Sequence, residues 1–340
     1  MAKAPGTKSE AKNGSKKTKK LTLKDVEAAA ERLKNWGKWG KNDQIGTLNY
    51  TTPEDIVKAA TLVRKGQVIS LAIPYDKEGP QGGKTKFPPV GRFNPVHLML
   101  RSGADAYSGV LDKRGIRSAD DLLLFPMQSG THWDGLGHIF YGNHMWNGYD
   151  CREVNSFGAH QCGIQHTAEK MVGRGVLLDI ARHMKKDWLD DGFAIDNDTL
   201  DACMKSQNVT VGRGDHLFIR TGQMERCWND KTWDGYPGGD APGLAFETLD
   251  WLQAHQVAAV ATDTWGVEVR PNAVEDGQNI NQPWHWICIP IMGLTMGEIF
   301  KLDELAKACA ADKRHEFMFV GPALPITGAV GSPINPIAIL

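Results

Sequence analysis

Short apolar segments with the alternation of β-strands recur along this chain, and they constrain its fold more than any other feature. Alternate side chains of a strand share a face, so such segments pack against a core. The predicted strands cover residues 67–75, 95–103, 122–134, 173–181, 215–222 and 256–264. Helical stretches separate only some of them, so the order is not a strict βαβ repeat. The sequence therefore predicts a single α/β domain with a mixed β-sheet or partial barrel and flanking helices.

Helices are predicted where apolar residues recur with helical spacing. These stretches are 21–36, 52–66, 242–255 and 303–313. The second has the clearest start, because Thr52 can cap a helix, Pro53 suits its first turn and Gly66 can end it. The last residues, 324–340, are rich in Gly and Pro, and we expect them to wrap the surface in an extended form.

Charge is concentrated at the N-terminus. Residues 1–20 hold seven Lys and one Glu, whereas the whole chain has a formal net charge of −1. Because this segment has almost no apolar side chains, residues 1–21 are predicted to be a disordered basic tail and residues 22–340 the folded domain. The overall charge gives no general attraction to nucleic acid, and we expect neither a nucleic-acid nor a membrane partner.

Features of targeting and of cysteine usage favour a cytoplasmic protein. The N-terminus lacks the apolar stretch of a secretory signal, and no run of about 18 apolar residues is present that could span a bilayer. The six cysteines are scattered and form no CxxC pair, which gives no support to a thiolate zinc site. Free thiols in a reducing compartment are therefore expected.

Polar residues gather in the stretch QSGTHWDGLGH at 128–138. If this stretch is a strand, Gln128, Gly130, His132 and Asp134 point to one face, and the glycine leaves room in its middle. Imidazole nitrogen and carboxylate oxygen suit Zn²⁺ or Mn²⁺, and Gln128 could add a neutral oxygen. His138 follows a glycine turn and could act as a general base beside a metal.

A structural role for these residues is the alternative. The histidines and Asp134 could make ordinary hydrogen bonds in a solvated turn, and His285 could simply pack between Trp284 and Trp286. The sequence has no GxGxxG, GxxxxGK[ST] or GxSxG motif, so nucleotide cradles and a serine nucleophile elbow find no support.

The stretch SGTHWDGLGH resembles the signature of the cyclase superfamily, which includes bacterial kynurenine formamidase and isatin hydrolase. The signature is His-x-Gly-Thr-His-x-Asp-x-x-x-His, and Gln128 stands here at its first histidine. The resemblance extends over residues 35–340. Further stretches that carry it are 173–181, 214–222, 261–269 and 285–298. It implies a swivelling β/β/α-like fold.

The resemblance also implies roles for individual residues. His132 and Asp134 become metal ligands, and His138 becomes the catalytic acid and base. His285 and Glu298 match a later pair that completes a second metal position bridged by the aspartate. Gln128 is the one departure, because a neutral amide oxygen binds a metal more weakly than imidazole.

The activity implied is the metal-dependent hydrolysis of an amide, lactam or related carbonyl in a small molecule. A divalent Zn or Mn ion would activate water, and His138 would transfer protons. Two alternatives stay open: a metal-dependent cyclase or lyase, and a binding protein that has lost activity through Gln128.

The remaining expectations concern the substrate and the assembly. Trp133, Trp146 and Trp284 lie near the proposed site in sequence and could form an apolar wall for an aromatic substrate, although core packing is the alternative. A homo-oligomer is expected, because the Gly- and Pro-rich C-terminus and apolar loops could bury against a second subunit.

Overall fold

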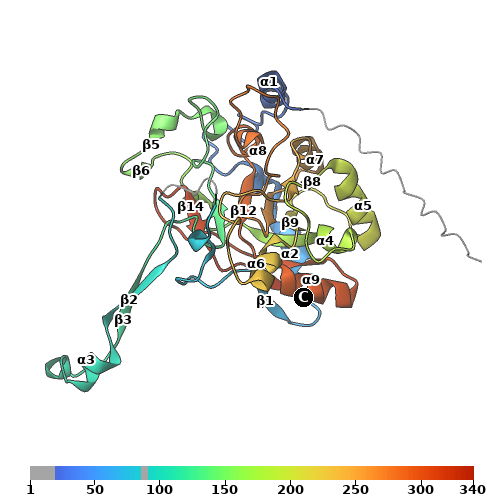
Figure 1. The fold of residues 1–340 in the computed structure, drawn as a ribbon. Coiled ribbons are helices and arrows are strands. Elements are labelled where there is room, and N and C mark those ends of the chain that lie inside the picture. Colours follow the sequence, from blue (N-terminus) through green and yellow to red (C-terminus); the bar gives the residue numbers. More distant parts are fainter. Residues whose placement is uncertain (1–19, 86–90) are drawn as a thin grey trace, which may run out of the picture.

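A curled, nine-stranded mixed sheet is the central element of the computed structural model, which describes residues 20–85 and 91–340. The strand order is β1-β15-β13-β7-β9-β11-β12-β4-β14. The sheet forms a half-barrel with helices alongside (Figure 1). The pairs β7–β9, β9–β11 and β11–β12 are parallel, and the other neighbours are antiparallel. This architecture confirms the predicted α/β domain with a mixed sheet and partial barrel.

The strands of this sheet are mostly short. They are β1 (Val68–Ser70), β4 (His132–Asp134), β7 (Val172–Asp179), β9 (His216–Arg220), β11 (Ala259–Thr262), β12 (Thr295–Glu298), β13 (Glu316–Val320), β14 (Gly331–Pro333) and β15 (Ile337–Ile339). Six further strands form three two-stranded ribbons: β2 (Val96–Arg101) with β3 (Asp120–Leu124), β5 (Val154–Asn155) with β6 (Gly158–Ala159), and β8 (Ala194–Ile195) with β10 (Gly243–Leu244). The ribbon of β2 and β3 projects from the rest of the molecule (Figure 1).

The α-helices are also short. They are α1 (Leu23–Arg32), α2 (Pro53–Ala60), α3 (Gly103–Tyr107), α4 (Ile180–His183), α5 (Asn197–Gln207), α6 (Gln223–Asp230), α7 (Thr248–His255), α8 (Pro283–Ile287) and α9 (Asp303–Asp312). Thr52 caps α2 as predicted, and its hydroxyl accepts from the backbone of Asp55. None of the helices in the described part of the chain has the length and apolar character needed to cross a bilayer.

Several boundaries differ from those predicted. Helix α2 ends at Ala60, before Gly66, and α7 begins at Thr248, because residues 243–244 pair with β8 instead. Leu21, placed in the tail by the sequence, exchanges backbone hydrogen bonds with Ala273 and Glu275 and belongs to the domain. Lys20 pairs with Asp276 at the surface, and residues 1–19 of the predicted tail lie outside the described residues.

The predicted strand 122–134 is wrong in the middle. It is divided into β3 and β4 by a turn in which the backbone of Ser129 donates to Pro126. Leu122–Leu124 belong to β3 and His132–Asp134 form β4, and the residues between them leave the sheet because Pro126 has no N–H to donate. The C-terminal segment also differs from prediction: it supplies β14 and β15, and Ala338 is fully buried.

Apolar side chains fill both faces of the sheet. Along β7, Val176 and Leu178 join one buried cluster, whereas Leu177 joins the other, as the two-residue period of a strand requires. The cluster with Leu177 also contains Trp133, Phe218 and several other aromatic residues. A polar side chain on a strand that is buried on both faces therefore needs a hydrogen-bonding, charged or metal partner.

Candidate metal centre

Strand β4 places the predicted site residues between two other strands. It pairs with β12 on one side and with β14 on the other, both antiparallel. Glu298 of β12 stands directly opposite His132, and directly opposite residues of an antiparallel pair share a face. Asp134 lies on this face too, two residues along β4. Strand register therefore brings an imidazole and two carboxylates together.

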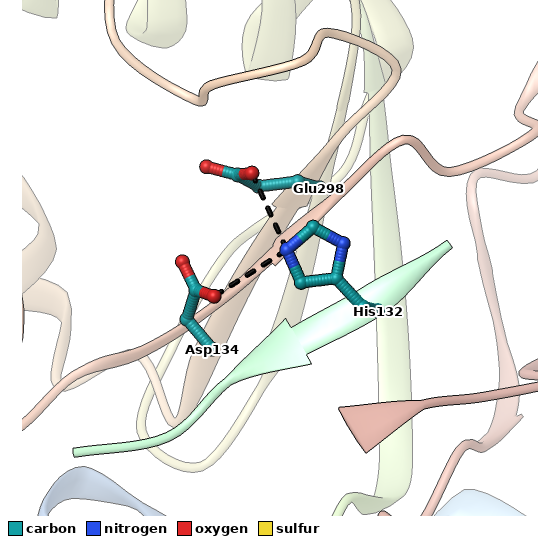
Figure 2. Close-up of side chains that lie close together, drawn as sticks. All are labelled: His132, Asp134 and Glu298. Carbon is teal, nitrogen blue, oxygen red and sulfur yellow. Dashed lines mark ion pairs between the residues drawn. The ribbon is translucent and has the colours of Figure 1, made fainter. Parts of the chain in front are cut away.

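These three side chains form a compact buried group, shown in Figure 2. The Nε2 atom of His132 lies 3.3 Å from Oδ1 of Asp134 and 3.3 Å from Oε2 of Glu298. One potential ligand atom from each residue lies within 4.8 Å of the others. His132, Asp134 and Glu298 are 0%, 1% and 3% exposed, so solvent does not compensate their charges.

The donor atoms point inward because the rest of each group is held. Nδ1 of His132 lies 2.7 Å from the carbonyl oxygen of Gly130 and donates to it. This hydrogen bond leaves Nε2 free to accept or to bind a metal. Within the described residues, Nε2 of His132 and Oδ1 of Asp134 are buried without a regular hydrogen-bond partner. One nitrogen and two carboxylates fit a divalent ion such as Zn²⁺ or Mn²⁺.

His138 lies at the edge of this group. The turn after β4, closed by a hydrogen bond from the His138 backbone to Gly135, returns the imidazole toward the strand. Its Nε2 atom lies 3.7 Å from Oδ1 of Asp134, and its side chain is 21% exposed. His138 is therefore the one histidine of the signature that both faces the carboxylate and reaches solvent.

His285 approaches the cluster from α8. Its Nε2 atom lies 3.4 Å from Oε1 of Glu298, and its Nδ1 atom hydrogen-bonds to Oε1 of Glu268. Glu268 also accepts from Asn272 and from the backbone N–H groups of Trp284 and His285. His285 and Glu298 thus lie beside the signature residues, and their role as metal ligands stays a prediction.

Glu268 is a site residue that the sequence analysis missed. It is fully buried and orients His285, as carboxylates often orient metal-binding histidines. The available signal was a carboxylate between Val267 and Val269 in an apolar stretch. A buried carboxylate in such a stretch needs a partner, and here His285 is that partner.

Burial and the neighbouring charges set the protonation of the cluster. Burial alone would lower the pKa of His132, but Asp134 and Glu298 outweigh it and raise the pKa to about 9. Burial is likewise outweighed at His285, where Glu268 and Glu298 raise the pKa to about 10. The carboxyls of Asp134 and Glu298 have lowered pKa values, because their histidine neighbours overcome the effect of burial.

His138 shifts in the opposite direction. Burial lowers its pKa, and Asp134 opposes this effect only in part. A lowered pKa keeps the imidazole neutral near pH 7 and able to accept a proton. The cluster therefore separates two kinds of histidine: two that hold protons tightly when no metal is bound and one that does not.

Gln128 lies in the turn before β4 and is buried. Its Nε2 atom has no partner among the described residues and lies only 2.5 Å from the place where a Cβ on Gly331 would be. Gly331 stands opposite Asp134 in the register of β14 and β4. The missing side chain of Gly331 thus makes room for the Gln128 amide beside the cluster.

The three tryptophans do not occupy the positions that a substrate wall requires. Trp133 follows His132 in the strand and so points to the opposite face, where its indole packs on Phe300 and donates to the Gly321 carbonyl. Trp146 donates to Asp43, and Trp284 donates to Thr248. All three are 0% exposed. Their positions support core packing, the alternative to the predicted substrate wall.

Fold and site together define an α/β half-barrel protein with a candidate divalent-metal centre on two adjacent strands, β4 and β12. The chain belongs to the cyclase family: the family described as "Putative cyclase" matches residues 51–269. A solved structure described as a novel cyclase is 38% identical, with a TM-score of 0.80, over 91% of this chain and 100% of that one. These matches confirm the family predicted from the signature.

More distant structures share the fold. Isatin hydrolase A from Labrenzia aggregata, bound to benzyl benzoate, is 18% identical with a TM-score of 0.58, over 85% of this chain and 98% of that one. Isatin hydrolase A from Ralstonia solanacearum is 16% identical, with the same TM-score and coverage. No match is found among curated proteins.

Proposed function

We propose that this chain is a metal-dependent hydrolase of a non-peptide C–N bond in a small amide, lactam or related carbonyl compound. One observation carries the proposal: His132, Asp134 and Glu298 converge in a buried group, with His138 beside it. The similarity in fold to isatin hydrolases supports the choice of reaction class. A lyase or cyclase shares the metal and the histidine, but no feature of the described residues favours it.

His132, Asp134 and Glu298 would hold a divalent cation, Zn²⁺ or Mn²⁺. Such an ion polarises a bound carbonyl and lowers the pKa of water toward neutrality. His285 is a further proposed ligand, because its Nε2 atom faces Glu298 and its Nδ1 atom is held by Glu268. Gln128 is a proposed neutral ligand, since its amide lies beside Gly331, opposite Asp134.

His138 would move the protons of the reaction. In its neutral form, Nε2 can take a proton from a water molecule at the edge of the cluster. The same atom can then pass that proton to the leaving nitrogen. Asp134 lies 3.7 Å away and stabilises the imidazolium between these steps. Partial exposure of the ring lets it exchange protons with solvent.

Substitution of His138 tests this proposal. His138→Ala should lower kcat by about 10²–10⁴, the usual contribution of a general base, and should retain the metal. The matched control is His144→Ala, an exposed histidine of the same loop, which should keep both activity and metal. Release of acid from candidate amides and lactams and elemental analysis are the two measurements. Wild-type turnover in His138→Ala would contradict the assignment, and metal-free wild-type protein would favour an inactive binding member of the family.

A further inference from the structure

Arg92 is a cation at the edge of the site that lacks an acidic partner among the described residues. Its guanidinium lies over the indole of Trp265, with Cζ 4.7 Å from the ring centroid. Its Nη1 atom is buried and has no hydrogen-bond partner in the described part of the chain. The Nε1 atom of Trp265 is buried and unpartnered in the same way. Two neighbouring groups thus present N–H donors that the protein itself does not satisfy.

These donors lie next to the metal cluster. A Cβ on Gly266, the residue after Trp265, would lie 3.8 Å from Oε1 of Glu298 and 3.9 Å from Cε1 of His285. The positive charge of Arg92 also contributes to lowering the pKa values of both Asp134 and His138. Arg92 and Trp265 are therefore close enough to act on a molecule bound at the cluster.

The backbone around Arg92 is fixed to the turn that precedes β4. The side chain of Asn94 accepts from the backbone N–H of Gln81 at 2.8 Å. The Gln81 amide in turn donates to the Ser129 carbonyl at 3.1 Å. The loop that carries Arg92 is thus linked through Gln81 to the turn that precedes His132.

A buried guanidinium N–H without an acceptor is costly, and the acceptor that matches a guanidinium best is a carboxylate. We propose that Arg92 and Trp265 form an anion subsite that binds a carboxylate of the substrate near the hydrolysed carbonyl. The substrate class is then a small amide or lactam that carries a carboxylate, not a neutral one. This inference rests on the proposed hydrolase function and adds to it a preference for substrates that carry a carboxylate.

Two formanilides that differ in one group test the subsite: one with an ortho-carboxylate and one unsubstituted. Because a hydrogen bond to a charged group is worth about 1.5–3 kcal/mol, Arg92→Gln should lower kcat/KM for the carboxylated substrate by about ten- to hundred-fold. The loss on the carboxylated substrate should appear in KM and should exceed any change on the uncharged substrate, because the effect of the Arg92 charge on His138 is common to both. Arg92→Lys should restore part of the loss.

Arg270 provides the matched control. Its Cζ lies 6.0 Å from the same indole ring, but its Nη2 atom donates to the Gly238 carbonyl. Arg270→Gln should leave the preference between the two substrates unchanged. Equal losses on both substrates in Arg92→Gln would overturn the subsite and show a general structural effect.

Binding of benzoate separates the subsite from the reaction. Titration calorimetry on metal-loaded protein should show weaker benzoate binding to Arg92→Gln than to wild type, whether or not either formanilide is hydrolysed. If neither substrate reacts and benzoate still discriminates the two proteins, the proposed function fails and the subsite stands. Equal binding of benzoate to the two proteins would overturn the subsite.

Discussion

Metal affinity should depend steeply on pH, and the slope should count the histidines that bind the ion. In the metal-free protein, His132 and His285 have pKa values of about 9 and about 10, so both are protonated near neutrality. A histidine must lose its proton to bind a metal. Asp134 and Glu298 are already ionised and release none, because their pKa values are lowered.

The expected slope follows from this count. If both histidines are ligands, each unit of pH below 9 should raise the apparent metal affinity by about hundred-fold, since two protons leave. If His132 alone binds, the rise should be about tenfold per unit. The same shifts act on stability. Both folded pKa values lie above the usual value of 6.5, so their contribution is complete below 6.5 and is lost as the pH rises through 9 and 10.

Competition against a chelating indicator between pH 6.5 and 8 measures the slope, with the proton binding of the indicator itself subtracted. Thermal unfolding of the metal-free protein should show a Tm that falls as the pH rises from 6.5 toward 10. His285→Gln is the matched variant and should reduce a slope of two to a slope of one. An affinity that does not change with pH would refute the reasoning, because it would mean that no histidine proton is displaced.

Two further substitutions test the surroundings of the site. Glu268→Gln removes the charge that does most to raise the pKa of His285, so the slope of metal affinity with pH should fall toward one. An unchanged slope would show that Glu268 does not control the protonation of His285. Gly297→Ala would bring a Cβ within 2.5 Å of Phe300, 2.7 Å of Trp133 and 2.9 Å of Ala261. This overpacking should lower the free energy of unfolding by about 1–3 kcal/mol, and an unchanged denaturant midpoint would contradict the packing described.

The local part of the site was predictable from the sequence. His132 and Asp134 are two residues apart, and the period of a strand places both on one face wherever a strand forms. The same rule excludes Trp133, the residue between them, from that face. Its proximity in sequence suggested a substrate wall, but alternation places it opposite Gly297, where the missing side chain leaves room for the indole.

The distant part of the site was not predictable from local pattern. Glu298 ends a short strand after an apolar stretch, and His285 lies between two tryptophans; each residue is equally compatible with a structural role. The resemblance to the cyclase family suggested both, but it did not suggest Glu268 or Arg92. Glu268 contacts His285, and Arg92 contacts Trp265, only because the fold brings together segments that are far apart in the sequence.

The C-terminal segment shows why the sequence misplaces such parts. Its glycines and prolines suggest a surface wrap, yet β14 borders β4 at the edge of the sheet. An edge strand tolerates Pro333, which has no N–H to donate, and Gly331 makes room for Gln128. Strand β4 has only three residues, so its register depends on both β12 and β14. The residues that suggest an irregular surface segment are thus the ones that allow the chain end to pack beside the candidate metal centre.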